Sequence, residues 1–216
     1  RKWGKRKIGN VTIHSKALAE GVILKPGMAA WLRTADCATV VAYNRRTSQT
    51  GVAHAGRASL VDEAKLRRNH PDNKSRRDES VIDALARILI PRKTSARHIE
   101  AWSGVCIGPG DFGHSFGHPL YGGFNRRLVD YLAHLYGSDL FLGPLQFGQF
   151  DLRSLIFRQW LQHGVCRENI SQDDTDTVPD RIGLGGYDWH SRRRETGEGQ
   201  RGINPGRNSI IVMSLA

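Results

Sequence analysis

Hydrophobic positions form a nearly continuous run over residues 27–44, GMAAWLRTADCATVVAYN, which is rich in small and β-branched residues. The turn-like segment RRTSQTG and a second short run, VAHA at 52–55, follow it. Apolar runs of this kind, bounded by turn residues, are typical of strands inside a sheet. The pattern therefore predicts two neighbouring strands, the first of them buried on both faces.

Three later segments carry the spacing of amphipathic helices. SLVDEAKLRRN (59–69) is the first, and DESVIDALARILI (78–90) is the second, which begins with acidic residues and ends before Pro91. The third, FDLRSLIFRQWLQHGV (150–165), offers Gly164 as the residue just past its end. One face of this helix would carry Leu152, Leu155, Ile156, Gln159 and Trp160.

Two further segments predict strands: HIEAWSGVCIGPG (98–110), which ends in a turn, and NSIIVMSL (208–215). Strands and helices mixed in this order indicate an α/β or α+β fold with mixed sheets. No repeat or low-complexity linker divides the chain, and 216 residues with 39% hydrophobic positions suit one compact domain with its own core.

The chain shows no segment built to enter a membrane. No run approaches the roughly 18 apolar residues that a membrane helix requires, and RKWGKRKIGN lacks the apolar stretch of a signal peptide. Cys37, Cys106 and Cys166 are widely spaced and odd in number, which indicates reduced thiols and no disulfide framework. We therefore expect a cytoplasmic protein without membrane association.

A formal net charge of +11 and a pI of about 10.1 favour anionic, phosphate-bearing partners. The basic residues are dispersed along the chain, in RKWGKRK, KLRRNHPDNKSRR, NRRL and HSRRR, with few aromatic residues between them. A nucleic-acid partner is compatible with this charge but is not favoured, because solvated faces account for most such runs.

Cys37 and His54 end up close together if the two predicted strands pair. A thiolate and an imidazole are a ligand pair that Zn²⁺ favours, and they are also a nucleophile with its base. Spacing alone does not distinguish these sites from two side chains that simply fill a core, and cysteine is among the most buried residue types.

GHSFG at 113–117 matches the G-x-S-x-G pattern of a nucleophile elbow around Ser115. The residues that follow, HPLYGGFN, are unsuited to the helix that an elbow requires, so the match is not favoured. His114 and His118 flank the serine, and with His98 they could bind a metal in principle. We expect these loop histidines to face solvent.

RTADCATVVAYN followed by GVAHAGRASL resembles the paired signature of the laccase-domain family, also called the polyphenol oxidase or purine nucleoside phosphorylase family, which reads T-A-D-C and then H-A-G-W. Other segments match in order over nearly the whole chain. AEGVILKPG resembles A-D-A-L-V-x-x-x-P-G, SGVCIGPGDF resembles I-G-P-x-I-G-P, and DLRSLIFRQWLQHGVCRENI resembles the family's late helix. SRRRE (191–195) and GRNSIIVMSL (206–215) resemble its closing S-H-R-R-D and G-R motifs.

The resemblance implies a layered α/β/β/α sandwich, a single laccase-like domain over residues 1–216 that a longer N-terminus could precede. It also implies a mononuclear zinc held by a cysteine and two histidines, and the matching residues are Cys37 and His54. The third ligand usually lies in an upstream Q-V-H-G motif, where RKWGK places Trp3, so His14 in NVTIHS is the histidine left for this role. Copper fits less well, because multicopper centres need H-x-H pairs and none occurs among the nine histidines.

Three departures from the family pattern stand out. Arg57 replaces the tryptophan after H-A-G, DDT at 173–175 replaces a C-T motif, and TGEGQRGINP (196–205) is inserted between the closing motifs. The first of these adds a positive charge beside the candidate site.

Members of the family are purine nucleoside phosphorylases and adenosine deaminases, so the resemblance implies a zinc-dependent enzyme that acts on purine nucleosides with phosphate. Cys37 and His54 would be catalytic, with Asp36 in support. Phosphorolysis needs cationic donors for phosphate, and the candidates for substrate binding are Arg57, Ser191, Arg193, Arg194 and Arg207. Two alternatives stay open: a metal-free hydrolase with Cys37 as nucleophile and His54 as base, and a non-catalytic basic protein that binds nucleotides or nucleic acid.

Overall fold

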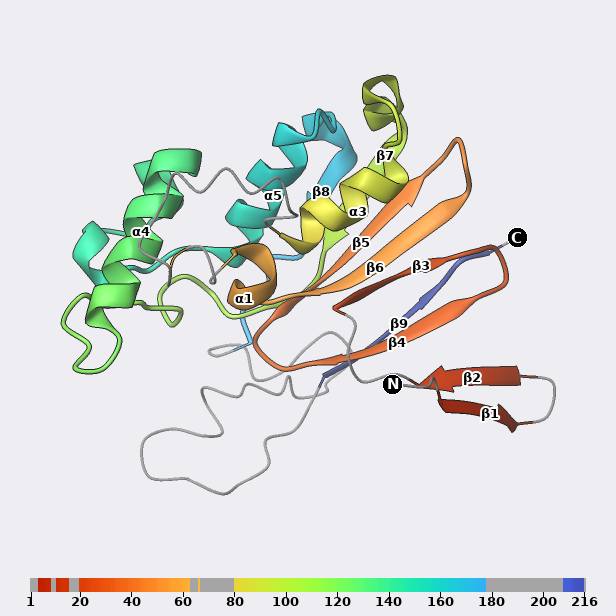
Figure 1. Ribbon diagram of the computed structural model, residues 1–216, viewed down its shortest axis with the longest axis horizontal. Helices are drawn as coiled ribbons and strands as arrows, with labels where there is room; N and C mark the ends of the chain where they lie inside the picture. Colours follow the sequence, from red (N-terminus) through yellow and green to blue (C-terminus); the bar gives the residue numbers. More distant parts are fainter. Residues whose placement is uncertain are drawn as a thin grey trace.

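The computed structural model of the chain describes residues 4–8, 11–15, 20–62, 66, 80–177 and 208–215, with backbone alone for 4–15 and 93–95. Its centre is a five-stranded sheet in the order β3-β6-β5-β7-β8 (Figure 1). The strands are β3 (Gly21–Leu24), β5 (Ala38–Asn44), β6 (Gln49–Ala55), β7 (Ile99–Ser103) and β8 (Ile170–Gln172). β7 and β8 pair in parallel and the other pairs are antiparallel, so the predicted mixed α/β fold is confirmed.

β5 and β6 form the hairpin that positions the site. Ala38 pairs with Ala55 and Thr39 pairs with His54, so Cys37, one residue before β5, lies at the end of β6. At the other end of the hairpin, the Asn44 side chain accepts hydrogen bonds from the N–H groups of Arg46 and Thr47. An asparagine that bonds the backbone just ahead of it stabilises a turn, and such a turn fixes the register of the two strands.

The apolar run at 27–44 is two strands in two different sheets, and the predicted single strand is wrong. β4 (Ala29–Thr34) pairs with β9 (Asn208–Met213) in a separate two-stranded sheet, while β5 belongs to the central one. Residues 35–37 form a bend between them. The Asp36 carbonyl accepts a hydrogen bond from the Ile107 N–H, an interaction between distant segments that apolar periodicity does not reveal.

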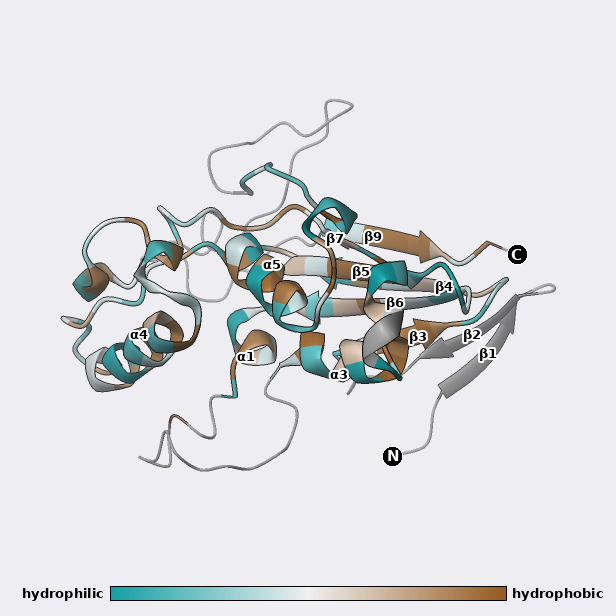
Figure 2. Ribbon diagram, turned by 90° about the horizontal axis from the view of Figure 1, so that it is seen from above, coloured by the Kyte–Doolittle hydropathy of each residue, from teal (hydrophilic) through white to brown (hydrophobic). Residues whose placement is uncertain are grey.

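β4 is also more exposed than predicted, because its burial alternates between exposed and half-buried positions. Figure 1 shows the β4–β9 pair on the side of the central sheet opposite to α3. Figure 2 shows β9 as a hydrophobic strand, and its residues Ile211 and Met213 are exposed together with Trp31 of β4. The described layers are therefore helices, the central sheet and this smaller sheet.

α3 (Val81–Leu89) and α5 (Leu152–Gln162) cover one face of the central sheet (Figures 1 and 2). α5 buries the face that its sequence predicts, which consists of Leu152, Leu155, Ile156, Gln159 and Trp160. Gly164 follows it with a φ of +79°, which confirms this glycine as the residue that ends the helix. The helix predicted at 59–69 is interrupted: α1 spans only Arg57–Leu60, and Val61 is extended.

The remaining elements connect these layers. α4 (Gly122–Tyr136) is the longest described helix, and residues 104–121 join it to β7. β1 (Gly4–Ile8) and β2 (Val11–Ser15) pair with each other as an antiparallel hairpin. Short 3₁₀ helices are η1 (Lys93–His98), η2 (Ser138–Leu140), η3 (Leu145–Phe147) and η4 (Arg167–Asn169). Within the described segments, no helix combines the length and the apolar character needed to cross a membrane.

Candidate active site

Cys37 and His54 meet at the end of the β5–β6 hairpin, where Gly56 lies against both of them. A Cβ built on Gly56 would stand 2.8 Å from the Cys37 sulfur and 3.3 Å from Cε1 of His54. Both side chains are only partly buried, so the contact lies at the protein surface and not in the core. The structure thus brings together the two residues that the sequence singles out, at a partly exposed position.

Glu20 completes this group and is the residue that sequence reasoning missed. Its Oε2 lies 2.7 Å from Nδ1 of His54, and it also accepts a hydrogen bond of 3.3 Å from the Ser59 hydroxyl. With Nδ1 engaged by Glu20, Nε2 is the ring nitrogen that remains for the Cys37 sulfur. Glu20 directly precedes β3, and only the pairing of β3 with β6 reveals that it reaches His54.

The electrostatics of the group favour a charged histidine. The hydrogen bond with the Cys37 side chain raises the pKa of His54 to about 9, aided by Glu20 and opposed by partial burial. In the absence of a bound metal, this raised pKa favours the protonated, positively charged ring. An imidazolium between a sulfur and a carboxylate can donate a proton, which is what a departing base or amine requires.

Asp36 is held by Thr177, a residue distant in the sequence. The Thr177 hydroxyl donates a hydrogen bond of 3.0 Å to Oδ1 of Asp36, and the Thr177 N–H donates to the Cys106 carbonyl. The carboxylate of Asp36 thus ties residues 173–177 to the bend that carries Cys37. This contact is consistent with the supporting role expected for Asp36.

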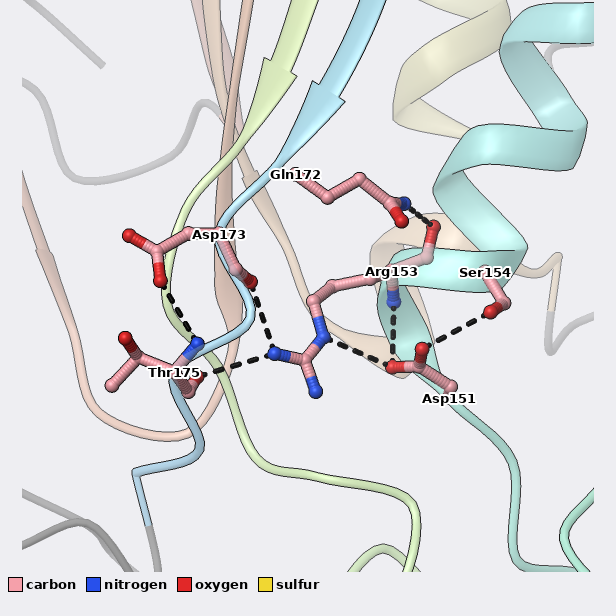
Figure 3. Close-up of polar contacts among 6 residues, drawn as sticks. All are labelled: Asp151, Arg153, Ser154, Gln172, Asp173 and Thr175. Carbon is pink, nitrogen blue, oxygen red and sulfur yellow. Dashed lines mark hydrogen bonds and ion pairs between the residues drawn. The ribbon is translucent and has the colours of Figure 1, made fainter.

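Residues 173–177 are fixed in turn by Arg153, the second residue of α5 (Figure 3). Its guanidinium is buried; Nε donates to Asp151 at 3.2 Å, and Nη1 donates to the carbonyls of Asp173 at 3.0 Å and Thr175 at 3.3 Å. Gln172 bonds the Arg153 carbonyl at 2.6 Å. The DDT segment, which replaces the family's C-T motif, is therefore held as a fixed part of the structure.

The candidate substrate-binding residues are only partly described. The Arg57 guanidinium stacks over the Phe124 ring at 5.5 Å, which places it beside Gly56 but anchored on α4. Ser191, Arg193, Arg194 and Arg207 lie outside the described residues. His14 lies in β2 opposite Lys5, with its backbone alone described, and Trp3 is outside the described residues.

The two histidines that flank Ser115 belong to the local structure of their loop. His114 is buried, with its ring stacked on Phe150 and edge-on to Phe112, so the expectation that it faces solvent is wrong. Of these two rings, Phe112 is near in sequence and Phe150 is distant, and a local reading of GHSFG does not reveal the contact with Phe150. His118 is exposed, as expected, and the Ser115 hydroxyl accepts a hydrogen bond from the Gly117 N–H. α4 begins only at Gly122, so the elbow geometry is not formed.

Cys37 and His54, two of the three residues that the resemblance implies as zinc ligands, lie side by side at Gly56. In the part of the chain that the structure describes, no group of three or more His, Cys, Asp or Glu residues is arranged to hold a metal. Glu20 takes the outer position on Nδ1 of His54, a carboxylate position that is common behind metal-bound histidines. The described residues fit a zinc site that needs one further ligand, and His14 is the candidate.

Comparison with known proteins gives the family. Residues 15–208 match the family model described as multi-copper polyphenol oxidoreductase laccase, and the chain belongs to this laccase-domain family. A comparison with curated proteins finds no match.

Solved structures share the fold. YlmD from Geobacillus stearothermophilus is similar with a TM-score of 0.63 and 17% identity, over 91% of this chain and 61% of that one. The Bacillus licheniformis hypothetical protein YfiH has a TM-score of 0.58 and 18% identity, over 89% of this chain and 60% of that one. Neisseria meningitidis protein NMB0706 has a TM-score of 0.58 and 19% identity, over 90% of this chain and 64% of that one. The chain therefore spans about three fifths of the length of these structures.

Proposed function

We propose that this laccase-domain protein acts on purine nucleosides at the Cys37–His54 site, cleaving the glycosidic bond with phosphate or removing the amino group. The observation that carries the proposal is the contact of the Cys37 sulfur and the His54 ring beside Gly56, with Glu20 on Nδ1 of the ring. Family membership supports the assignment of this contact as the reactive centre.

In phosphorolysis, a phosphate oxygen forms a bond with C1′ of the ribose while the bond from C1′ to the purine nitrogen breaks. The departing purine needs a proton. A histidine that binds zinc is neutral, so we propose that the incoming phosphate or solvent supplies this proton when zinc is bound. Arg57 is proposed to attract the phosphate, with Arg193, Arg194 and Arg207 assisting and Ser191 as a hydroxyl donor. Asp36 keeps Cys37 in place through Thr177.

Zinc is the proposed cofactor, held by Cys37, His54 and His14. When bound, it would supply an open coordination position at which water or phosphate loses a proton near neutral pH. The family description names copper. A multinuclear copper centre would need clustered H-x-H pairs, which the sequence lacks, so we propose zinc.

The test is chromatographic detection of free purine base, or of the deaminated nucleoside, from adenosine and inosine, with and without phosphate and added zinc. We expect product in the wild type and none in Cys37→Ala. Cys166→Ala is the matched control, since Cys166 is a partly buried cysteine outside the site, and it should retain activity. No product from a folded, zinc-replete wild type would overturn the proposal.

A second candidate is a metal-free hydrolase, favoured by the direct hydrogen bond between the Cys37 and His54 side chains. The thiolate would attack the carbonyl carbon of an amide, His54 would give a proton to the leaving amine, and water would then release the acid from the thioester. This reaction leaves a covalent intermediate on Cys37, and chelators would not inhibit it. Nucleoside turnover that a chelator abolishes would exclude it.

A further inference from the structure

Glu20 contacts His54 twice, through its backbone and through its side chain. The His54 N–H donates a hydrogen bond of 2.7 Å to the Glu20 carbonyl, and Nδ1 of the ring lies 2.7 Å from Oε2 of the same residue. The Ser59 hydroxyl, from α1, donates to that same Oε2 and so restrains the carboxylate from a second element. A surface glutamate without a specific role would have neither the contact with His54 nor the one with Ser59.

The local sequence explains why Glu20 comes so close. Gly21, the next residue, packs against β6 so tightly that a Cβ there would meet the Ala53 Cβ and the Val52 carbonyl oxygen at 3.0 Å each. Gly21 pairs with Ala53, the residue before His54. Because Gly21 has no side chain, the start of β3 can approach β6 closely within the sheet. This close approach sets Glu20 beside the imidazole.

The contact is too exposed to be explained by stability. The side chain of Glu20 is 61% exposed and that of His54 is 36% exposed. Ion pairs at such positions add little to the free energy of unfolding, because water screens the charges. The hydrogen bond does, however, decide which ring nitrogen is engaged, and a carboxylate on one imidazole nitrogen orients the other.

We infer that Glu20 is a positioning residue, which fixes the His54 ring with Nδ1–H on its carboxylate and Nε2 toward the Cys37 sulfur. It acts through His54 and is not itself a catalytic residue. This inference rests on the proposed function only where activity is measured, because the orientation of the ring can be observed without any substrate.

The experiment compares Glu20→Ala and Glu20→Gln with the wild type, with Glu100→Gln as the control. Glu100 lies on β7 of the same sheet, away from the site. It is half-exposed and forms an ion pair with Arg45. Proton NMR at one fixed pH should show a downfield Nδ1–H signal of His54 in the wild type and in Glu100→Gln. The signal should be lost in Glu20→Ala and shifted upfield in Glu20→Gln, with unchanged unfolding midpoints.

Two functional readouts follow from the same variants. The affinity for added Zn²⁺ and the kcat for nucleoside cleavage should each fall roughly 10- to 100-fold in Glu20→Ala, with KM little changed. A wild-type NMR signal together with wild-type zinc affinity in Glu20→Ala would overturn the inference. Loss of the signal in a protein that never turns over nucleosides would uphold the role of Glu20 while refuting the proposed function, so the two failures are distinguishable.

Discussion

The sulfur of Cys37 lies directly against Gly56: a Cβ on this glycine would come within 2.8 Å of it. The backbone of Gly56, with φ of −92° and ψ of 172°, is in a region open to any residue. The glycine is therefore not required by the chain conformation. It is required by the space that the sulfur occupies beside His54.

Gly56→Ala should lower activity at the Cys37–His54 site by roughly 10- to 100-fold, since small displacements of reacting groups are costly in rate. The new methyl group would push the sulfur away from the imidazole, while the fold stays intact. Gly110→Ala is the control, because a Cβ at Gly110 meets nothing within 4 Å and its φ is not positive. Steady-state kinetics and thermal unfolding measure the two effects; equal activity in both variants would contradict this account of the site.

Arg153→Met should destabilise the fold by about 2–4 kcal/mol, because the buried guanidinium is replaced and its partners stay behind. Those partners are the Asp151 carboxylate and the carbonyls of Asp173 and Thr175 (Figure 3). Urea unfolding measures the change. Asp139→Asn is the control; Asp139 pairs with Arg158 at an exposed position, so its replacement should have little effect.

Arg153→Met should also loosen residues 173–177, and with them the contact of Thr177 with Asp36. Hydrogen exchange would show faster exchange at the N–H of Thr177, which bonds the Cys106 carbonyl. If exchange there equals that of the wild type, Arg153 does not hold this segment.

The elements that sequence predicts well are those whose signals are local. The face of α5 and the glycine that ends it follow from helical spacing, and the β5–β6 hairpin follows from two apolar runs around a turn. That hairpin register alone brings Cys37 and His54 together. By contrast, the bend at 35–37 depends on contacts with Ile107 and Thr177, which lie far along the chain.

Glu20 and His114 illustrate the same limit in the candidate sites. Glu20 lies in AEGVILKPG, where it matches an acidic position of the family pattern, but its contact with His54 is visible only once β3 is paired with β6. His114 lies among glycines, as a solvent-facing residue would, yet Phe112 and Phe150 enclose it. In both cases a decisive neighbour, His54 for Glu20 and Phe150 for His114, lies far away in the sequence, so periodicity and composition carry no information about the contact.

The contribution of Asp83 to the stability of the fold should depend on pH. It accepts the Ser80 N–H at 2.8 Å in the capping box of α3 and contacts Nε2 of His163 at 2.7 Å. Burial raises the pKa of this carboxyl, but the hydrogen bonds from His163 and Ser80 outweigh it and hold the pKa below its ordinary value of 3.8. A carboxyl with a lowered pKa stabilises the fold above that ordinary value and loses its contribution as the pH falls through the folded value.

Asp83→Asn should therefore cost about 1 kcal/mol at pH 7, the typical value of a helix cap or a hydrogen bond. The difference from the wild type should shrink as the pH falls below 4. Asp83 is protonated first in the unfolded state, and below its lowered folded pKa it is protonated in both states. Urea unfolding at pH 7, 5, 4 and 3 measures it. A difference that grows towards low pH would have the wrong sign for this explanation.

His14 is the residue on which the zinc proposal depends, since Cys37 and His54 are only two of the ligands that a zinc site requires. His14→Ala should lower the zinc content of purified protein well below that of the wild type, measured by mass spectrometry of the metal, because each lost ligand removes a bond to the ion. Thr12→Ala, two residues earlier on the same face of β2, is the control for damage to the hairpin and should keep its zinc. Zinc content unchanged by His14→Ala but lost in Cys37→Ala would assign the third ligand to another residue. Zinc absent from the wild type and from every variant, with amide hydrolysis that depends on Cys37, would instead establish the metal-free hydrolase.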